Sequence, residues 1–369
     1  MNKELALICA NEFDNRDGTI SLRSVPQYSL GRVYLMDPVT DEIRDVFRKE
    51  QSSSRLFCAF PFNENELIVG SKSVANMRNV TEIKGQSVFY QQRVVFNSKL
   101  IEYNPKSKEE NLLVEEKGEI FFACSFNDDI VYGRRLGLQN YEIVLFDYKS
   151  KVVKKSYIRE CPFFSGIQLG EYIVAVSGAE GCFEDEDAKF VDYYGAIEKN
   201  LPTSKAEETT KTLTFVDYND RKDKIVLFNP LTGETIQLNI ADLPTGLIPS
   251  ITLRGDKLVY PVNKINGRKV FSFIFELDLN EKKSHSYGAG DSGWISAAAH
   301  FGDKIMFSNE DNECKDDPGD FLNKHRRDYI YVAHLEENLA YPSYSFGRVE
   351  SILPVNKNVK KKWFLKVLK

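Results

Sequence analysis

The chain has 369 residues, of which 42% are hydrophobic, and a chain of this size can bury a large core without disulfides or a structural metal. Its formal net charge of −5 argues against a general nucleic-acid-binding protein, which needs a basic surface to displace the counterions of phosphates. No apolar run approaches the ~20 residues of a membrane helix, and the N-terminal apolar run is too short for a signal peptide. We therefore expect a cytoplasmic protein that binds neither nucleic acid nor a membrane directly.

Six cysteines are scattered along the chain, at positions 9, 58, 124, 161, 182 and 314. They form no CxxC pair and no Cys/His group with the spacing of a zinc site. Several lie within apolar runs, such as Cys9 in LALICA and Cys124 in IFFACSF. This pattern favours buried free thiols in a reducing compartment over disulfides, and it predicts neither a metal nor a cofactor.

One unit recurs six times. An alternating apolar strand runs into Asp or Asn (in one copy His), and a short polar turn then leads into a second strand. Asp and Asn accept hydrogen bonds from the backbone of their own turn, and period-two alternation is typical of a half-buried strand, so each copy predicts a β-hairpin. In chain order the copies are RVYLMDPVTDEIRDVF at Asp37, KLIEYNPKSKEENLLV at Asn104, EIVLFDYKSKVVKKSY at Asp147, KIVLFNPLTGETIQL at Asn229, FIFELDLNEKKSHSY at Asp278 and YIYVAHLEENLAYPSY at His334.

Two further apolar runs precede each of the later hairpins, for example IFFACSF and DIVYGR before the third. Four strands per unit, A to D in chain order, form the blade of a β-propeller. The sequence therefore predicts an all-β propeller of six blades, a single domain over residues 1–369. The N-terminal run LALICA fits strand B of the first blade and the C-terminal run ESILPV fits its strand A, so these strands should pair and close the ring. The surplus run KKWFLKVL near the C-terminus leaves open a seventh blade, a fifth strand or a fragment of a longer chain.

The connections between strands B and C are long, at residues 11–30, 71–92, 178–223 and 308–327, whereas the other turns are mostly tight. In a propeller all B–C loops open on one face, so the insertions 71–92, 178–223 and 308–327 should lie on that face together. Loops of this length in compact domains are usually functional or disordered. We interpret this face as the working surface; unselected loop growth on a tolerant face is the alternative.

The longest insertion is acidic, with twelve acids against six bases between Ala179 and Asp223. A charge run followed by aromatics fits either a solvated loop or a docking surface for a protein partner. Clustered carboxylates also suit calcium, although the EF-hand pattern is absent. The candidate partner-binding residues are Phe183, Glu184, Asp185, Glu186, Asp187, Phe190, Tyr193, Tyr194, Trp294, Arg326 and Arg327.

The segment GAGDSGWISAAAHF contains two fragments that resemble serine-protease signatures, one at Ser292 and one at His300. Their order is the reverse of that in the chymotrypsin-like family, and at ~3.3 Å per residue the two side chains should lie roughly 25 Å apart. No phosphate-binding loop, dinucleotide motif or kinase motif occurs. We therefore assign no catalytic residue, and we expect His300, on a strand A, to be a packed, hydrogen-bonded residue.

The six-unit layout resembles the TolB-like six-bladed propellers, on hairpins such as LFNPLTGETI and over the whole chain. The resemblance implies the fold but no particular activity, because binders and enzymes share this fold. The sequence favours a non-catalytic interaction or regulatory protein, a subunit or partner in a larger complex, that binds a protein through its long-loop face. The alternatives are a propeller enzyme, a hydrolase or lyase with a site at the channel mouth, and a sensor of a small ligand or calcium.

Overall fold

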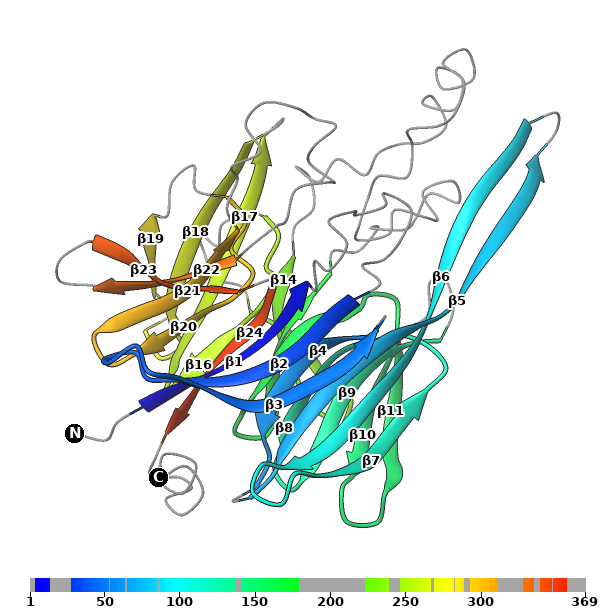
Figure 1. Cartoon of the computed structure of the whole chain (residues 1–369), viewed down its shortest axis with the longest axis horizontal. Coiled ribbons are helices and arrows are strands. Elements are labelled where there is room, and N and C mark those ends of the chain that lie inside the picture. Colours follow the sequence, from blue (N-terminus) through cyan, green and yellow to red (C-terminus); the bar gives the residue numbers. More distant parts are fainter. Residues whose placement is uncertain are drawn as a thin grey trace.

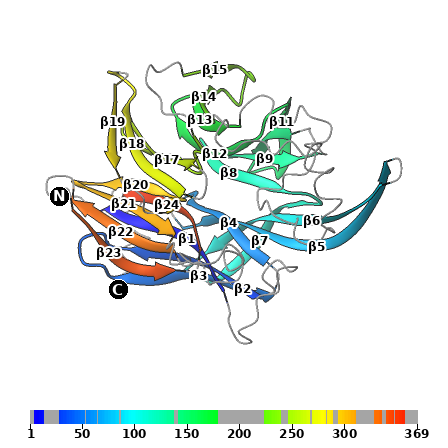
Figure 2. The same cartoon turned by 90° about the horizontal axis from the view of Figure 1, so that it is seen from above.

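The computed structural model describes residues 4–13, 28–52, 54–63, 65–84, 87–136, 141–178, 223–238, 246–266, 269–281, 283–288, 293–310, 328–334, 339–346 and 348–356. Its elements are all strands, and they form six four-stranded antiparallel sheets arranged as the blades of a propeller (Figure 1). Seen from above, the inner strands β4, β8, β12, β20 and β24 lie toward the middle, and outer strands such as β3, β11 and β19 lie toward the rim (Figure 2). The predicted six-bladed, all-β fold is confirmed.

The blades follow one another in the sequence, and each runs from its inner to its outer strand. Blade 1 is β24 (Arg348–Asn356), β1 (Glu4–Phe13), β2 (Tyr28–Met36) and β3 (Ile43–Ser52). Blade 2 is β4 (Ser54–Pro61), β5 (Leu67–Lys84), β6 (Ser87–Asn104) and β7 (Glu109–Glu116). Blade 3 is β8 (Ile120–Phe126), β9 (Asp129–Arg135), β10 (Tyr141–Asp147) and β11 (Val152–Arg159).

The second half of the ring repeats this order. Blade 4 is β12 (Phe163–Leu169), β13 (Tyr172–Ser177), β14 (Lys224–Phe228) and β15 (Thr235–Gln237). Blade 5 is β16 (Thr252–Arg254), β17 (Lys257–Asn266), β18 (Lys269–Asp278) and β19 (Lys283–Gly288). Blade 6 is β20 (Ala298–Phe301), β21 (Lys304–Glu310), β22 (Asp328–His334) and β23 (Leu339–Phe346).

Blade 1 closes the ring, because it combines strands from both ends of the chain. Strand β1 pairs with β24 in antiparallel register from Glu4↔Asn356 to Asn11↔Arg348. This pairing gives β1 a neighbour on both edges, since β2 pairs with its other side. The predicted closure is confirmed, while the surplus run 361–368 lies outside the described residues.

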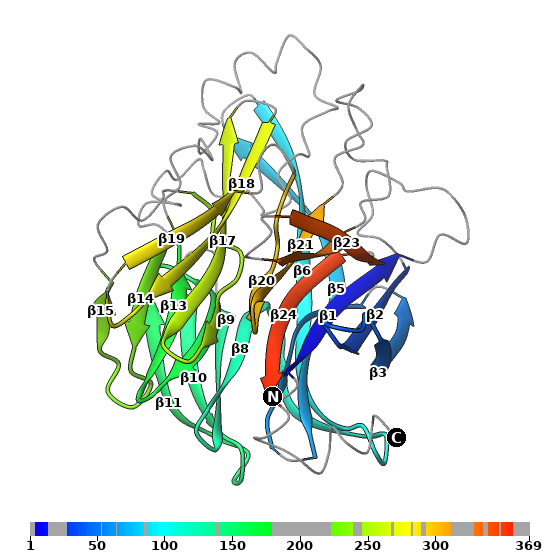
Figure 3. The same ribbon diagram turned by 90° about the vertical axis from the view of Figure 1, so that its left-hand side faces the viewer.

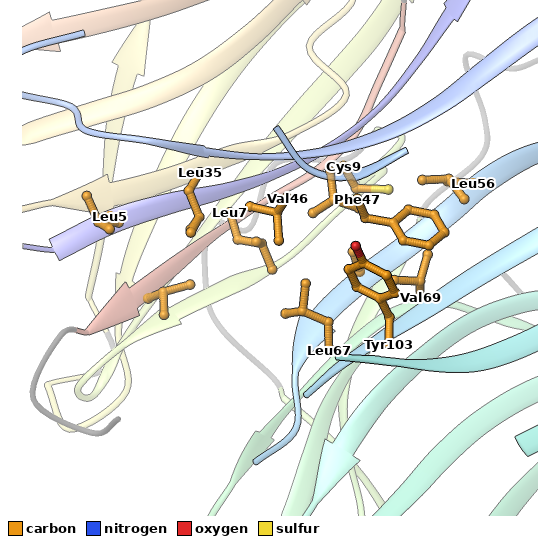
Figure 4. Packing of buried hydrophobic residues seen from close by; sticks show 13 residues of the cluster. Leu5, Leu7, Cys9, Leu35, Val46, Phe47, Leu56, Leu67, Val69 and Tyr103 are labelled. Atoms are coloured by element: carbon orange, nitrogen blue, oxygen red, sulfur yellow. The ribbon is translucent and has the colours of Figure 1, made fainter. Parts of the chain in front are cut away.

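The apolar strand β1 is buried on both faces, and its side chains alternate between two hydrophobic clusters. Leu5, Leu7 and Cys9 pack with Leu56, Leu67 and Val69 of blade 2 (Figure 4). Ala6, Ile8 and Ala10 pack instead with residues of blade 6 such as Ala299 and Met306. Further clusters of the same kind join the other neighbouring blades. A strand buried between two blades therefore needs a continuous apolar run, which explains why LALICA shows no polar alternation.

The hairpin turns between strands C and D form as the sequence predicts. The Oδ1 atom of Asp37 accepts a hydrogen bond from the Val39 backbone N–H at 3.0 Å, and that of Asp147 accepts from Lys149 at 2.9 Å. Asn104, Asn229 and Asp278 accept equivalent bonds from residues two and three positions later. The predicted role of the Asx residue is thus confirmed at five of the six copies. The turn after His334 lies outside the described residues.

The long connection predicted at 71–92 was expected to be a loop, and this expectation is wrong. Residues 71–84 continue β5, and residues 87–92 belong to β6; the two strands stay paired to Lys84↔Ser87. Valines, threonine, isoleucine and aromatics, which favour strands, are frequent in this segment, and this composition is the physical reason for the hairpin. The hairpin rises from the same side of the ring as the β17–β18 hairpin (Figures 1 and 3).

The fourth residue after the Asx position adopts a left-handed backbone in four turns, at Asp41, Lys108, Lys151 and Gly233. Only Gly233 is a glycine there, and a Cβ atom at this position would overlap the ring of Tyr157. Gly170 also has a left-handed φ of 60°, but nothing lies within 4 Å of its Cβ position. We predict that Gly233→Ala lowers the free energy of unfolding by roughly 2–3 kcal/mol, because backbone strain and overlap add.

The matched control is Gly170→Ala, which carries the backbone strain without the overlap and should cost roughly 1 kcal/mol. Urea unfolding of both variants measures the difference. Equal losses would show that the Tyr157 ring moves away without cost.

Candidate functional site

One face of the ring, which we call the long-connection face, is where strands A begin, strands B end and the B–C connections leave. The β5–β6 hairpin lies on this face. The segments 179–222 and 311–327 lie outside the described residues, but the strands that flank them end on this face in paired positions, Ser177↔Lys224 and Glu310↔Asp328. The opposite face, which we call the turn face, carries the Asx turns.

Asn11 joins blade 1 to blade 2 on the long-connection face. Its side chain is 1% exposed, and its Nδ2 donates to the Leu56 carbonyl at 2.9 Å while its Oδ1 accepts from the Leu56 N–H at 2.8 Å. The same Nδ2 donates to Oε1 of Glu350 at 2.9 Å. A buried amide group thus satisfies both backbone groups of an inner-strand residue in the next blade.

Asn263 makes the same contact between blades 5 and 6. Its Nδ2 donates to the Ile295 carbonyl at 2.9 Å, and its Oδ1 accepts from the Ile295 N–H at 3.0 Å. Ser272 donates its hydroxyl proton to the carbonyl of Gly293, two residues before Ile295, at 2.5 Å. Between blades 2 and 3, Ser98 donates to Gly118 O at 2.8 Å and accepts from Ile120 N at 3.0 Å. We call these contacts the inter-blade clamps.

A partly buried group of charged side chains lies beside the first clamp, and we call it the charged cluster. Its members are Arg55, Lys72, Glu119, Arg135 and Glu350. Lys72 and Arg55 are register partners in blade 2. The Nζ atom of Lys72 lies 2.6 Å from Oε1 of Glu119, which precedes blade 3, and the two side chains are only 6% and 18% exposed. The cluster therefore ties blades 1, 2 and 3 together near their inner strands.

The charges in the cluster shift one another's pKa values. Burial lowers the pKa of Lys72, and the negative charge of Glu119 opposes this effect. Burial alone would raise the pKa of Glu119, but the charge and hydrogen bond of Lys72, with Arg55 and Arg135, hold it below its usual value. Each pKa shift thus depends on the contact between Lys72 and Glu119, whose geometry is that of a salt bridge.

Of the predicted partner-binding residues, only Trp294 belongs to the described part of the chain. It is half-buried and stands between Gly293 and Ile295, both held by an inter-blade clamp, so it lies on the long-connection face. The remaining ten, Phe183, Glu184, Asp185, Glu186, Asp187, Phe190, Tyr193, Tyr194, Arg326 and Arg327, lie outside the described residues. Their assignment as partner-binding residues therefore stays a prediction.

His300 lies near the turn face, in strand β20, and is 7% exposed. Its Nδ1 lies 2.8 Å from Oε2 of Glu276 in blade 5, whose Oε1 accepts from Lys257 Nζ at 2.7 Å. His300 is packed, as expected, and its Nδ1 faces the Glu276 carboxylate. Within the described residues, however, neither Nδ1 nor Nε2 has a partner with regular hydrogen-bond geometry, so the expected hydrogen bonding is not found. Ser292 lies outside the described residues.

The cysteines at positions 9, 58, 124 and 161 carry free thiols, and burial raises the pKa of Cys58 to about 12. Burial raises the pKa of Cys9 and Cys124 as well. These thiols are therefore poor nucleophiles at neutral pH. Cys182 and Cys314 lie outside the described residues. Across the described ranges no three His, Cys, Asp or Glu side chains gather as a metal site would require, and no helix has the length and apolarity to cross a membrane.

Sequence reasoning missed the clamps and the charged cluster. Asn11 and Asn263 each directly follow an apolar run in the second strand of a blade, in LALICAN and LVYPVN. A polar amide where a strand should still be buried is the available signal, because such a group must find partners. The partners themselves lie 45 and 32 residues away in the sequence, and no local pattern identifies them.

Comparison with solved structures supports the same architecture. The chain superposes on TolB from Acinetobacter baumannii with a TM-score of 0.52 at 10% identity, covering 95% of this chain and 66% of that one. This chain has a TolB-like six-bladed propeller fold. The propeller domain of the trilobed protease from Pyrococcus furiosus (TM-score 0.42, 10% identity, 94% and 96% covered) and a chain of a nidogen/laminin complex (0.49, 6%, 95% and 98%) also match. No family model and no curated protein matches the sequence.

At these identities the likeness to TolB concerns the fold alone. The TolB-like propeller shares its blade arrangement with proteins of different activities, so the comparison assigns no substrate or partner.

We predict that Asn11→Ala and Asn263→Ala each lower the free energy of unfolding by roughly 2–4 kcal/mol, because each leaves buried backbone groups of the next blade unsatisfied. Urea unfolding measures the loss. Asn65→Ala, at an exposed turn, serves as the control and should change stability by less than about 0.5 kcal/mol. If either clamp variant lost no more free energy of unfolding than this control, water would have taken over the hydrogen bonds of the missing amide.

We predict that the protein loses stability below about pH 6.5, and that His300 contributes to the loss. Burial lowers the pKa of His300, with the charges of Arg254 and Lys257 adding to this effect and Glu276 opposing it. The unfolded chain therefore binds a proton at a pH where the folded chain does not, and acid favours unfolding. Between about pH 7.5 and about pH 5.5, the wild type should therefore lose more of its free energy of unfolding than His300→Gln does.

Chemical denaturation at a series of pH values measures this difference. His285→Gln, at an exposed position of β19, is the matched control and should follow the wild type. Parallel curves for the wild type and His300→Gln would contradict the assignment.

Proposed function

We propose that this propeller is a non-catalytic interaction or regulatory protein that binds a protein partner through its long-connection face, as a subunit or partner of a larger complex. The observation that carries the proposal is the unequal construction of the two faces. On the turn face, tight Asx turns close the hairpins. On the long-connection face, β5 and β6 are each 18 residues long and run well past the strands that flank them in the blade.

The charged cluster and the clamps support this proposal, because they make the base of the long-connection face rigid. Lys72 and Glu119 neutralise each other, and Asn11 and Asn263 fix neighbouring blades. A rigid base carrying long connections is a common arrangement for recognition by loops. The acidic, aromatic-bearing segment 178–223 would supply the anchors, and a cytoplasmic location would suit the free thiols.

An enzyme with a site at the inner end of this face is the second candidate. The observation that favours it is the convergence of Arg55, Lys72, Glu119, Arg135 and Glu350 from three blades, with shifted pKa values at Lys72 and Glu119. The 2.6 Å contact between Lys72 and Glu119 favours a structural role for these two residues over a catalytic one, since each charged group is already paired with the other.

The proposal is tested by replacing residues 180–222 with a four-residue Gly/Ser linker. Ser177 and Lys224 are paired neighbours, so a short turn can join them without disturbing blade 4. We predict that the melting temperature changes by no more than a few degrees and that partner proteins no longer co-purify from the native source. Affinity purification with mass spectrometry measures the second outcome.

The control is Val39→Ser, at a residue 70% exposed on the turn face, which should leave co-purification unchanged. An unaltered set of partners after removal of 180–222, or partners lost in Val39→Ser, would overturn the proposal.

A further inference from the structure

Among the described residues, the outer part of the β5–β6 hairpin is a two-stranded ribbon whose two outer edges pair with no further strand. Strand β4 pairs with β5 only as far as Ser54↔Ser73, and β7 pairs with β6 only from Ser98↔Glu116. Beyond these points β5 and β6 pair with each other and with no further described strand. A register shift between Val74 and Asn76 marks the place where the ribbon leaves the blade, and Figures 1 and 2 show it projecting away from the ring.

A two-stranded ribbon of this kind is expected to need a further strand or surface to pack against. An isolated two-stranded hairpin is marginally stable in water, and stability normally needs a third strand or a packed face. An open edge presents a row of backbone donors and acceptors that can pair with another strand. The order of charged and apolar residues along β5 indicates which strand can pair with its edge.

From Asn76 to Lys84, β5 pairs regularly with β6, and the middle of this stretch is Val80. If two copies of β5 pair antiparallel about a two-fold axis at Val80, Arg78 of each copy stands opposite Glu82 of the other. In the same register Met77 stands opposite Ile83, and Asn79 stands opposite Thr81. Opposite charges and apolar residues directly across a ladder stabilise a pair of strands. No other antiparallel register places Arg78 opposite Glu82.

We propose that two copies of this chain associate through the free edge of β5, forming a symmetric dimer whose four-stranded sheet runs β6–β5–β5–β6 through both ribbons. A two-fold axis makes the contact self-complementary, as closed homodimers require. The edge of β6 does not offer the same match, because its free part, Ser87–Asn97, contains Arg93 and no acidic residue. Antiparallel self-pairing of that edge would join no opposite charges.

The charges allow a test that uses the intact chain. Arg78→Glu alone places Glu opposite Glu82 at both ends of the ladder, and Glu82→Arg alone places Arg opposite Arg78. Each variant should weaken self-association on the order of tenfold or more. The double variant Arg78→Glu/Glu82→Arg restores opposite charges and should dimerise again. A mixture of the two single variants should form heterodimers, because both charge pairs are then complementary.

Sedimentation velocity at increasing concentration measures the masses, with one single variant fluorescently labelled in the mixture. As a folding control, residues 74–96 are replaced by an Asn-Gly turn between Ser73 and Asn97, which are register partners. This variant should be monomeric, with a melting temperature close to that of the wild type.

A wild type that stays monomeric up to its solubility limit would overturn the proposal. So would a dimer that survives removal of the ribbon, or single variants and mixtures that all behave as the wild type. The partner-binding proposal is tested separately, because its variant lacks 180–222 and keeps the ribbon.

Discussion

The antiparallel ladder between β1 and β24 is the contact on which the rest of the ring depends. Strand β1 is the second strand of its blade, and its side chains fill the clusters facing both blade 2 and blade 6. Without β24 the blade would lack its inner strand, and β1 would present an open edge beside two apolar surfaces. The ladder thus pairs the inner edge of β1, completes blade 1, and holds β1 in the two hydrophobic clusters that join blade 1 to its neighbours.

Closure in this form determines where polar groups can lie. Strand β1 is buried on both faces, so its polar residue Asn11, near the strand end, must find partners across the blade boundary. At the turn face the Asx residues meet this need within their own hairpins. At the long-connection face Asn11, Asn263 and the Lys72–Glu119 pair meet it between blades. The Asx turns are therefore local contacts, whereas the clamps and the ion pair join distant parts of the chain.

This difference explains how much of the molecule could be predicted from the sequence. Hairpins such as that at Asp147 and the closing strand pair could be predicted, because strand periodicity and turn residues are local signals. The clamp from Asn11 to Leu56 and the ion pair from Lys72 to Glu119 could not, because each joins residues that only the assembled ring brings together. The projecting ribbon was not predicted, because a connection of this length between two strands is typical of a loop, although its residues favour strands. The acidic candidate residues, from Phe183 to Tyr194, stay untested because they lie outside the described segments.

The closure also sets an order of events during synthesis. Strand β1 leaves the ribosome well before its partner β24, which follows more than 300 residues later. At ~5–20 residues per second, β1 waits tens of seconds for its partner. Throughout that time an apolar segment made for burial on both faces stays exposed in the nascent chain. The architecture that leaves the finished ring without an open inner edge therefore makes the unfinished chain dependent on protection from aggregation, by chaperones or by rapid completion of blades 2 to 6.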